Sequence, residues 1–384
     1  MTTLAVAAVS ARMMAEAVRD DGFPVVALDL FGDADTRRAC THWHAIGEPH
    51  RLEIDGDRLL RALDALARDR CAVGWIAGAG FEGRADLLER GAARLRLIGT
   101  GADAMRRLRD PAVFFDVLAE HGIAHPPVRM AAPPERAGWL LKNAHGCGGW
   151  HVRRADLLGA DDLDEARAPL YFQREVAGRP MSATFVANGQ DACVLGFNQL
   201  NVRPMGALPF VFCGAIGPVA LPAGVGARVT AAVRVLAAAF ALRGLGSLDF
   251  MLDGDAFQVL EVNARPPASM ALYAWRRGLM AAHVRACIDG VLPRWPAPSP
   301  QIQSQAVRGT EIVYAPRRVQ LDEAAVRQLA CAGGGRHDLP AAAGVFEAGA
   351  PLCSVSACAA SAQAVRALLA RERDAVHQCL ENIA

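Results

Sequence analysis

The chain has 384 residues, 52% of them hydrophobic, and its 41 Lys and Arg residues nearly balance 40 Asp and Glu residues. This composition is typical of a globular protein of two or three domains and excludes a disordered chain, and a net charge of +1 gives no basic face for nucleic acid. No apolar run approaches the ~20 residues of a membrane span, and the N-terminus lacks a signal-peptide pattern, so we expect a cytoplasmic protein. The ten cysteines form no CxxC pair, which argues against both disulfides and a structural zinc site.

The first hundred residues alternate between apolar strands and amphipathic helices. Strands are expected at 4–9, 24–30, 72–77 and 95–98, and helices at 11–21, 57–68 and 84–94. This alternation indicates a parallel sheet with helices on both faces. We expect the unit to end near residue 105.

After residue 105 the pattern changes to short strands separated by Gly-containing turns. A helix is expected at 110–121, then a Pro-rich connector at 125–134 and strands at 139–143, 171–174, 182–187 and 193–197. A long helix at 223–242 precedes a hairpin with strands at 246–252 and 256–262. A helix at 273–289, a Pro-rich boundary at 293–300, a strand at 311–315 and a terminal helix at 361–382 complete the chain. The short strands indicate an antiparallel sheet.

Lys142 is the only lysine of the chain, so the other 40 of the 41 basic residues are arginine. In a chain this rich in Ala, Gly and Arg, a retained lysine indicates a role that the planar arginine fork cannot fill. Lys142 ends a predicted strand and precedes Gly146, Gly148 and Gly149, and such a loop lets backbone N–H groups approach a polyphosphate. It is not a Walker A loop, because the lysine precedes the glycines. The alternative is a hairpin loop that merely needs glycines.

A second polar cluster is predicted on the hairpin. Asp249 lies on its first strand, and Glu261, Asn263 and Arg265 follow at every second position along the other. Side chains two positions apart share one face of a strand, so two carboxylates and an amide oxygen would face one space, which suits Mg²⁺. Arg265 beside them suits an anion. The apolar residues between them indicate a buried opposite face, which argues against a simple solvent-facing hairpin.

Three weaker signals are interpreted as structural. A GxGxxG pattern at 78–83 is typical of dinucleotide sites, but it follows a later strand rather than the first, so we interpret it as a sheet-edge loop. His42 and His44 have no third metal ligand nearby, and Cys147 in the glycine loop has no identifiable general base. We therefore expect surface or packing roles for these residues.

The ordered set of Lys142, the glycine-rich loop, the segment FQREVAG, Asp249 and the E-x-N-x-R pattern at 261–265 resembles the ATP-grasp superfamily of carboxylate–amine ligases, over about residues 1–290. The resemblance implies an α/β ATP-grasp fold. Its parts would be a parallel α/β (pre-ATP-grasp) domain at 1–105, two α+β subdomains clamping ATP at 106–180 and 181–295, and a small C-terminal extension packing on this core at 296–384. The tail, with HDLPAAAG and EAGAPLCSV, is similar to ATP-grasp proteins related to tyramine–glutamate ligases of one-carbon (methanofuran-type) cofactor biosynthesis.

The resemblance implies nucleotide-binding roles for the matching residues. Lys142 would bind the α- and β-phosphates, and Arg109 stands where the family often has a first ATP lysine. The glycines of the loop would cover the β- and γ-phosphates. The adenine hinge would consist of Gln173, Arg174, Glu175 and Val176. Where the family's hinge often ends in an acid that binds the ribose, this chain has Arg179 and Pro180, so the ribose contact departs from the family pattern.

The resemblance also implies a metal site and a reaction. Asp249, Glu261 and Asn263 would hold two Mg²⁺ ions, for which Mn²⁺ can substitute, and Arg265 would steady the transferring phosphoryl group. The implied enzyme joins a carboxylate to an amine, such as glutamate to a tyrosine- or tyramine-like amine, through an acyl phosphate, with release of ADP and phosphate. Its partners would be these small molecules, and a homodimer is compatible with the family.

Two other classes stay open at this point. The Arg179 departure fits a catalytically silent ATP-binding or scaffold subunit. A biotin-carboxylase-like or purine-pathway enzyme would instead use bicarbonate as its carboxylate. ADP release that depends on an added carboxylate and amine, or on bicarbonate alone, distinguishes these classes.

Overall fold

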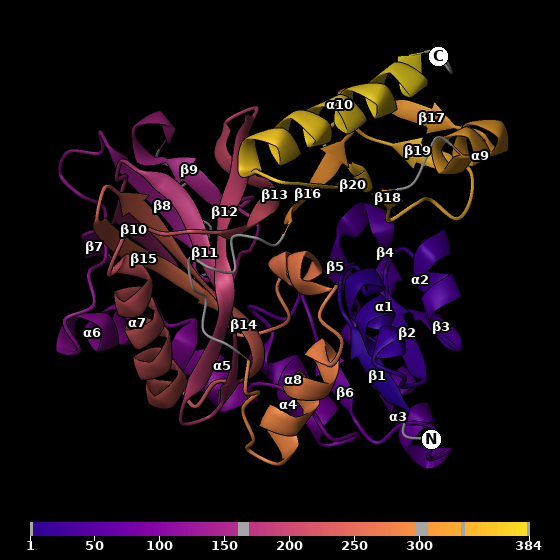
Figure 1. The fold of residues 1–384 in the computed structure, drawn as a ribbon, viewed down its shortest axis with the longest axis horizontal. Coiled ribbons are helices and arrows are strands. Elements are labelled where there is room, and N and C mark those ends of the chain that lie inside the picture. The colour runs from indigo at the N-terminus through magenta and orange to yellow at the C-terminus, as the bar shows by residue number, and fades with distance from the viewer. Residues whose placement is uncertain (1–2, 160–168, 296–305, 332–334, 382–384) are drawn as a thin grey trace.

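The computed structural model describes residues 3–159, 169–295, 306–331 and 335–381 (Figure 1). The N-terminal part is a four-stranded sheet in the order β3-β2-β1-β6, in which all pairs are parallel. Its strands are β1 (Leu4–Ala7), β2 (Val25–Asp29), β3 (His42–Ala45) and β6 (Trp75–Ala77), accompanied by helices α1 (Arg12–Asp20), α2 (Ala34–Ala39), α3 (Gly56–Arg68) and α4 (Ala85–Ala92). The predicted parallel α/β unit is confirmed.

Apolar patterning explains this unit. Every residue of β1 and β2 is buried, as expected of parallel strands that helices cover on both faces. Helix α3 buries Leu59, Leu63 and Leu66 at helical spacing. It begins after Asp55, whose side chain accepts hydrogen bonds from the backbone N–H groups of the first turn.

Two antiparallel sheets form most of the remainder. The smaller one has the order β7-β10-β8-β9, with β7 (Val128–Arg129), β8 (Trp139–Asn143), β9 (Val152–Arg154) and β10 (Leu170–Arg174). The larger has the order β15-β14-β11-β12-β13-β16-β20-β18. Its strands are β11 (Arg179–Asn188), β12 (Ala192–Met205), β13 (Leu208–Val219), β14 (Arg243–Asp253), β15 (Ala256–Asn263), β16 (Val307–Tyr314), β18 (Arg336–His337) and β20 (Pro351–Ala359). The predicted antiparallel second half is confirmed.

The remaining elements cover or connect these sheets. The helices are α5 (Ala102–Leu108), α6 (Pro111–Glu120), α7 (Val225–Ala239), α8 (Leu279–Ile288), α9 (Glu323–Cys331) and α10 (Ala362–Glu381). Two short strand pairs are β4 (Gly47–Glu48) with β5 (Glu53–Ile54), and β17 (Val319–Leu321) with β19 (Gly344–Phe346). Among the helices of the described ranges, none has both the length and the apolar character needed to cross a membrane.

The structure corrects several local predictions. The strand expected at 95–98 is reduced to one bridge, between Leu97 and Trp75. The helix expected at 273–289 is divided: a 3-10 turn ends at Tyr273, and α8 begins only after Gly278, whose φ of 87° interrupts a right-handed helix. Strands β13 and β20 were not predicted. Part of the Pro-rich boundary, 296–300, and the last residue of the expected terminal helix lie outside the described residues.

The C-terminal segment completes the large sheet. Strand β16 pairs with β13 and β20 pairs with β16. Helix α10 is fixed on this sheet through buried Glu311, which lies 2.7 Å from Arg203 and 3.0 Å from Arg373 of α10. The extension therefore shares a sheet with the second half of the chain. The domain boundaries at 105, 180 and 295 stay predictions.

Candidate active site

The acidic side chains predicted on the hairpin lie together. In the β14–β15 pairing, Asp249 stands opposite Glu261, and Ser247 stands opposite Asn263. Asp249 accepts hydrogen bonds from Ser247 Oγ at 3.2 Å and from Asn263 Nδ2 at 3.1 Å. Directly opposed residues of antiparallel strands have neighbouring side chains. The hairpin therefore brings two carboxylates and one amide to a single place.

The two carboxylates differ in how readily they ionise. Loss of hydration, together with repulsion from Glu261, raises the pKa of Asp249 to about 7. Glu261, with a side chain 30% exposed, also loses hydration, but the positive charges of Arg109, 3.7 Å away, and of Lys142 outweigh that loss and lower its pKa. The pair thus retains a proton up to about pH 7, and a bound cation would favour its release.

Lys142 reaches this place from the smaller sheet. It lies on β8, and its Nζ donates a hydrogen bond to Gln173 Oε1 at 2.6 Å. Burial lowers the pKa of Lys142, while Glu261 and Asp249 act in the opposite direction. An ammonium group has three donors, so Lys142 retains donor capacity for an anion.

The glycine-rich loop lies against the larger sheet. The carbonyl oxygen of Gly148 accepts a hydrogen bond from the backbone N–H of Phe212 on β13 at 2.9 Å. Gly149 has a φ of 78°, and a Cβ at this position would collide with the carbonyl oxygen of Phe210. The loop therefore requires glycine at residue 149 for the close approach of its backbone to β13.

The segment 173–176 contains the last two residues of β10 and the two residues that follow, and it combines buried and exposed side chains. Gln173 is buried beside Lys142, whereas the side chain of Arg174 turns to the carbonyl oxygen of Ala137 at 3.0 Å. Glu175 pairs with Arg154 at 2.6 Å, and Val176 is half-buried. Because its side chain points away, Arg174 would contact a ligand bound beside Gln173 only through backbone atoms.

Arg265 has a partner that the sequence analysis missed. Its Nε lies 2.7 Å from Glu82 Oε1, and the two side chains are only 14% and 3% exposed. Glu82 belongs to the 78–83 loop at the carboxyl end of β6, and its other oxygen accepts a hydrogen bond from the backbone N–H of Gly80 at 2.7 Å. The loop interpreted as a sheet edge thus holds Arg265. The position of Glu82 just beyond a parallel strand could have indicated its role, because ligand sites gather at the carboxyl ends of such strands.

Arg109 and His151 complete the site. Arg109, at the end of α5, lies 3.4 Å from Asn263 Oδ1 as well as close to Glu261. His151 follows the glycine loop, packs against Gly146, and was also missed by the sequence analysis. Burial lowers the pKa of His151, which favours the neutral ring. A pocket lies here, and its lining includes Arg109, Asn143, His151, Tyr171 and Glu261.

Three buried nitrogens of this site have no hydrogen-bond partner within the described part of the chain. They are Arg109 Nε, His151 Nδ1 and Gln173 Nε2. Unpaired polar atoms are rare in protein interiors because each one costs free energy. Arg109 and His151 line the pocket, and Gln173 lies beside Lys142. Together the three nitrogens indicate a place for a polar ligand.

Comparison with known proteins agrees with this geometry. Residues 110–269 match the model of the ATP-grasp domain. No curated protein sequence matches the chain.

Solved structures resemble the chain over nearly its whole length, at low identity. N5-carboxyaminoimidazole synthase from Aspergillus clavatus is 16% identical, with 98% of this chain and 99% of that one covered and a TM-score of 0.68. Biotin carboxylase from Campylobacter jejuni is 14% identical, with 96% and 89% covered and a TM-score of 0.68. L-amino acid ligase from Bacillus licheniformis is 14% identical, with 97% of each chain covered and a TM-score of 0.66. Residues 110–269 thus match the ATP-grasp domain, and the chain has a mixed α/β fold like that of these solved structures.

Proposed function

We propose that the chain is an ATP-dependent ligase that joins a carboxylate to an amine through an acyl phosphate. The observation that supports this best is the grouping of Lys142 and three unpaired nitrogens around the hairpin carboxylates. A polyphosphate with a divalent cation would give acceptors to the nitrogens and positive charge to the carboxylates.

The donor set of the hairpin fits Mg²⁺. Asp249, Glu261 and Asn263 offer oxygen ligands, which hard cations prefer. The raised pKa of Asp249 means that added positive charge would be favourable beside the two carboxylates. We propose two ions, with Glu261 between them and Mn²⁺ as a substitute. Bound metal would neutralise charge that develops on the phosphates.

We propose nucleotide-binding roles for the chain's own residues from the family resemblance, and the position of Lys142 beside Gln173 supports them. Lys142 and Arg109 would bind phosphate oxygens, with Gly146, Gly148 and Gly149 covering them. Adenine would lie at the hinge of Gln173, Arg174, Glu175 and Val176. Exclusion of water by the closed loop would protect an acyl phosphate from hydrolysis.

The proposed reaction balances in two steps. A carboxylate oxygen attacks the γ-phosphorus, the bond to the β-phosphate oxygen breaks, and ADP leaves. The amine nitrogen then attacks the acyl carbon, phosphate departs with the carboxylate oxygen, and the nitrogen loses a proton to solvent. Arg265, fixed by Glu82, would stabilise the charge that moves in the first step.

For the substrates we propose an amino-acid carboxylate such as glutamate and a tyrosine- or tyramine-like amine, in a cytoplasmic cofactor pathway. The resemblance of the fold to L-amino acid ligase and the HDLPAAAG tail support this choice. A second candidate is a carboxylating enzyme that uses bicarbonate, which the resemblance to N5-carboxyaminoimidazole synthase and biotin carboxylase favours.

The acyl phosphate is tested with ¹⁸O. When both oxygens of the carboxylate substrate are labelled, we expect one ¹⁸O in each released phosphate. The substrates would first be found by screening ADP release over pairs that include glutamate with tyramine. Label recovered in AMP, with release of pyrophosphate, would contradict the mechanism. ADP release with bicarbonate alone would support the second candidate, and ATP hydrolysis that no carboxylate stimulates would favour a silent subunit.

Metal affinity should depend on pH. A divalent cation competes with the proton on Asp249, whose pKa is about 7, so Mn²⁺ measured without nucleotide should bind about 10-fold more weakly at pH 6 than at pH 8. The raised pKa means that the metal-free folded state holds this proton more tightly than the unfolded state. The contribution of Asp249 to stability is therefore present at low pH and lost as pH rises through about 7.

Electron paramagnetic resonance of free Mn²⁺ measures this affinity directly. The matched control is Asp249→Asn, in which binding should be weaker and nearly independent of pH. An equal pH dependence in this variant would assign the proton to another group.

A further inference from the structure

The C-terminal segment 335–339 lies over the carboxyl edge of the N-terminal parallel sheet. The backbone N–H of Ala34, at the start of α2, donates to the carbonyl oxygen of Leu339 at 3.0 Å. Asp35 accepts from the backbone N–H groups of Asp338 at 2.7 Å and of Leu339 at 3.3 Å. Regions about 300 residues apart in sequence are thus held together by the HDLP part of the tail.

This junction contains more negative than positive charge. Arg12, whose side chain is 6% exposed, lies 2.7 Å from Glu16, 2.8 Å from Asp338 and 3.5 Å from Asp35. Its guanidinium forms a forked contact with both oxygens of Asp338, at 2.8 and 3.2 Å. One guanidinium therefore faces three carboxylates, and its strongest geometry is with Asp338.

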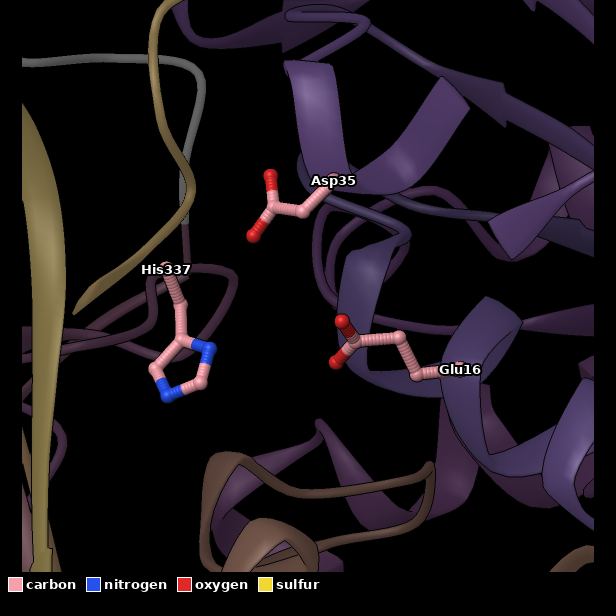
Figure 2. A group of neighbouring side chains, drawn as sticks. All are labelled: Glu16, Asp35 and His337. Carbon is pink, nitrogen blue, oxygen red and sulfur yellow. The ribbon is translucent and has the colours of Figure 1, made fainter. Parts of the chain in front are cut away.

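Two of these carboxylates, Glu16 and Asp35, also lie close to the imidazole of His337. Figure 2 shows the side chains of Glu16 from α1, Asp35 from α2 and His337 from β18 pointing toward one another. Each offers an oxygen or nitrogen, and these atoms all lie within 4.8 Å of one another. His337 Nε2 lies 2.9 Å from Ser356 Oγ, and the other ring nitrogen faces the carboxylates. A histidine ligand commonly has its second nitrogen oriented in this way.

We propose that Glu16, Asp35 and His337 bind a divalent transition-metal ion of the Zn²⁺ type, which fastens the C-terminal segment to the N-terminal domain. One imidazole and two carboxylates are a common ligand set for such ions, and water completes the coordination. Arg12 remains with Asp338. The site is separate from the hairpin carboxylates and goes beyond the proposed ligase function. The missing CxxC pair, which argued against structural zinc, concerns cysteine ligands only.

The test is equilibrium dialysis of the chelator-treated full chain against Zn²⁺, with bound metal counted by mass spectrometry. Because Zn²⁺ also binds carboxylates of the hairpin, all variants carry Glu261→Gln. In this background we expect one equivalent of Zn²⁺ at micromolar concentration and a higher thermal midpoint with metal. Adding His337→Ala should weaken binding by at least about 100-fold, and Ser356→Ala by about 10-fold.

Two variants keep the result interpretable. His42→Ala removes an exposed imidazole on β3 and should leave the equivalent unchanged. Glu16→Gln, at a partly exposed position, should weaken binding even if His337→Ala fails to fold. Absence of stoichiometric Zn²⁺ binding in the parent, or an equivalent that survives both His337→Ala and Glu16→Gln, would overturn the proposal.

Discussion

Replacing Lys142 with methionine should reduce ATP turnover to background, a loss of at least about 100- to 1,000-fold, while the protein stays folded. The ammonium group lies beside Gln173 and near the hairpin carboxylates, where it would meet the phosphates. Methionine keeps a long flexible chain and removes a partly dehydrated charge, so the thermal midpoint should fall little. A coupled assay of ADP release and a melting curve measure the two quantities.

Two comparisons sharpen this result. Lys142→Arg keeps the charge but places a planar fork in the space of an ammonium, so it should also lose most activity. Because the chain has no other lysine, an amine-reactive reagent should label only Lys142 and the N-terminal amine, and ATP should protect Lys142. Near-full activity of a folded Lys142→Met variant, or labelling that ATP leaves unchanged, would remove Lys142 from the site.

Arg265→Ala should lower kcat by about 100- to 1,000-fold and change ATP affinity much less, because its charge is needed chiefly when negative charge moves. Glu82 touches Arg265 rather than the proposed substrates, so Glu82→Gln should act through the placement of the guanidinium. Because a displacement of a catalytic group by about 1 Å can lower the rate about 100-fold, we expect Glu82→Gln to lower kcat by up to about 100-fold. Single-turnover rates and nucleotide affinities separate these quantities.

The double variant tests whether the two residues act as one unit. If Glu82 only positions Arg265, adding Glu82→Gln to Arg265→Ala should cost no further activity. Additive losses would give Glu82 a role of its own. A loss of ATP affinity with unchanged turnover in Arg265→Ala would make this arginine a ground-state anchor.

Local pattern was sufficient for part of the site where partners are close in the chain. Alternation along β15 places Glu261 and Asn263 on one face. Asp249 stands opposite Glu261 only because the β14–β15 register shifts between Asp249 and Phe250, and this irregularity was not predicted. Local pattern was also sufficient for β8, where the predicted strand at 139–143 matches the observed bounds. Fold class also followed, because strands that alternate with helices indicate a parallel sheet, and short strands separated by Gly-containing turns indicate an antiparallel one.

Partners far apart in the chain were not predictable in this way. Glu82 and Arg265 are 183 residues apart, and nothing in either local segment indicates the other. Their contact depends on how the N-terminal sheet docks on the hairpin. Strand β13 escaped prediction for a related reason: its Gly and Pro residues weaken the strand pattern, and pairing with β12 and β16 on either side compensates for that weakness.

The strand order of the large sheet has a consequence for biosynthesis. Strand β13 ends at Val219, but the strand that covers its outer edge, β16, begins only at Val307. While the ribosome adds the intervening residues, the part of β13 that later pairs with β16, Gly214–Gly217, presents unpaired backbone groups to other chains. The nascent protein is therefore vulnerable to edge-to-edge association until its last fifth emerges, and a chaperone that shields strand edges would raise its yield.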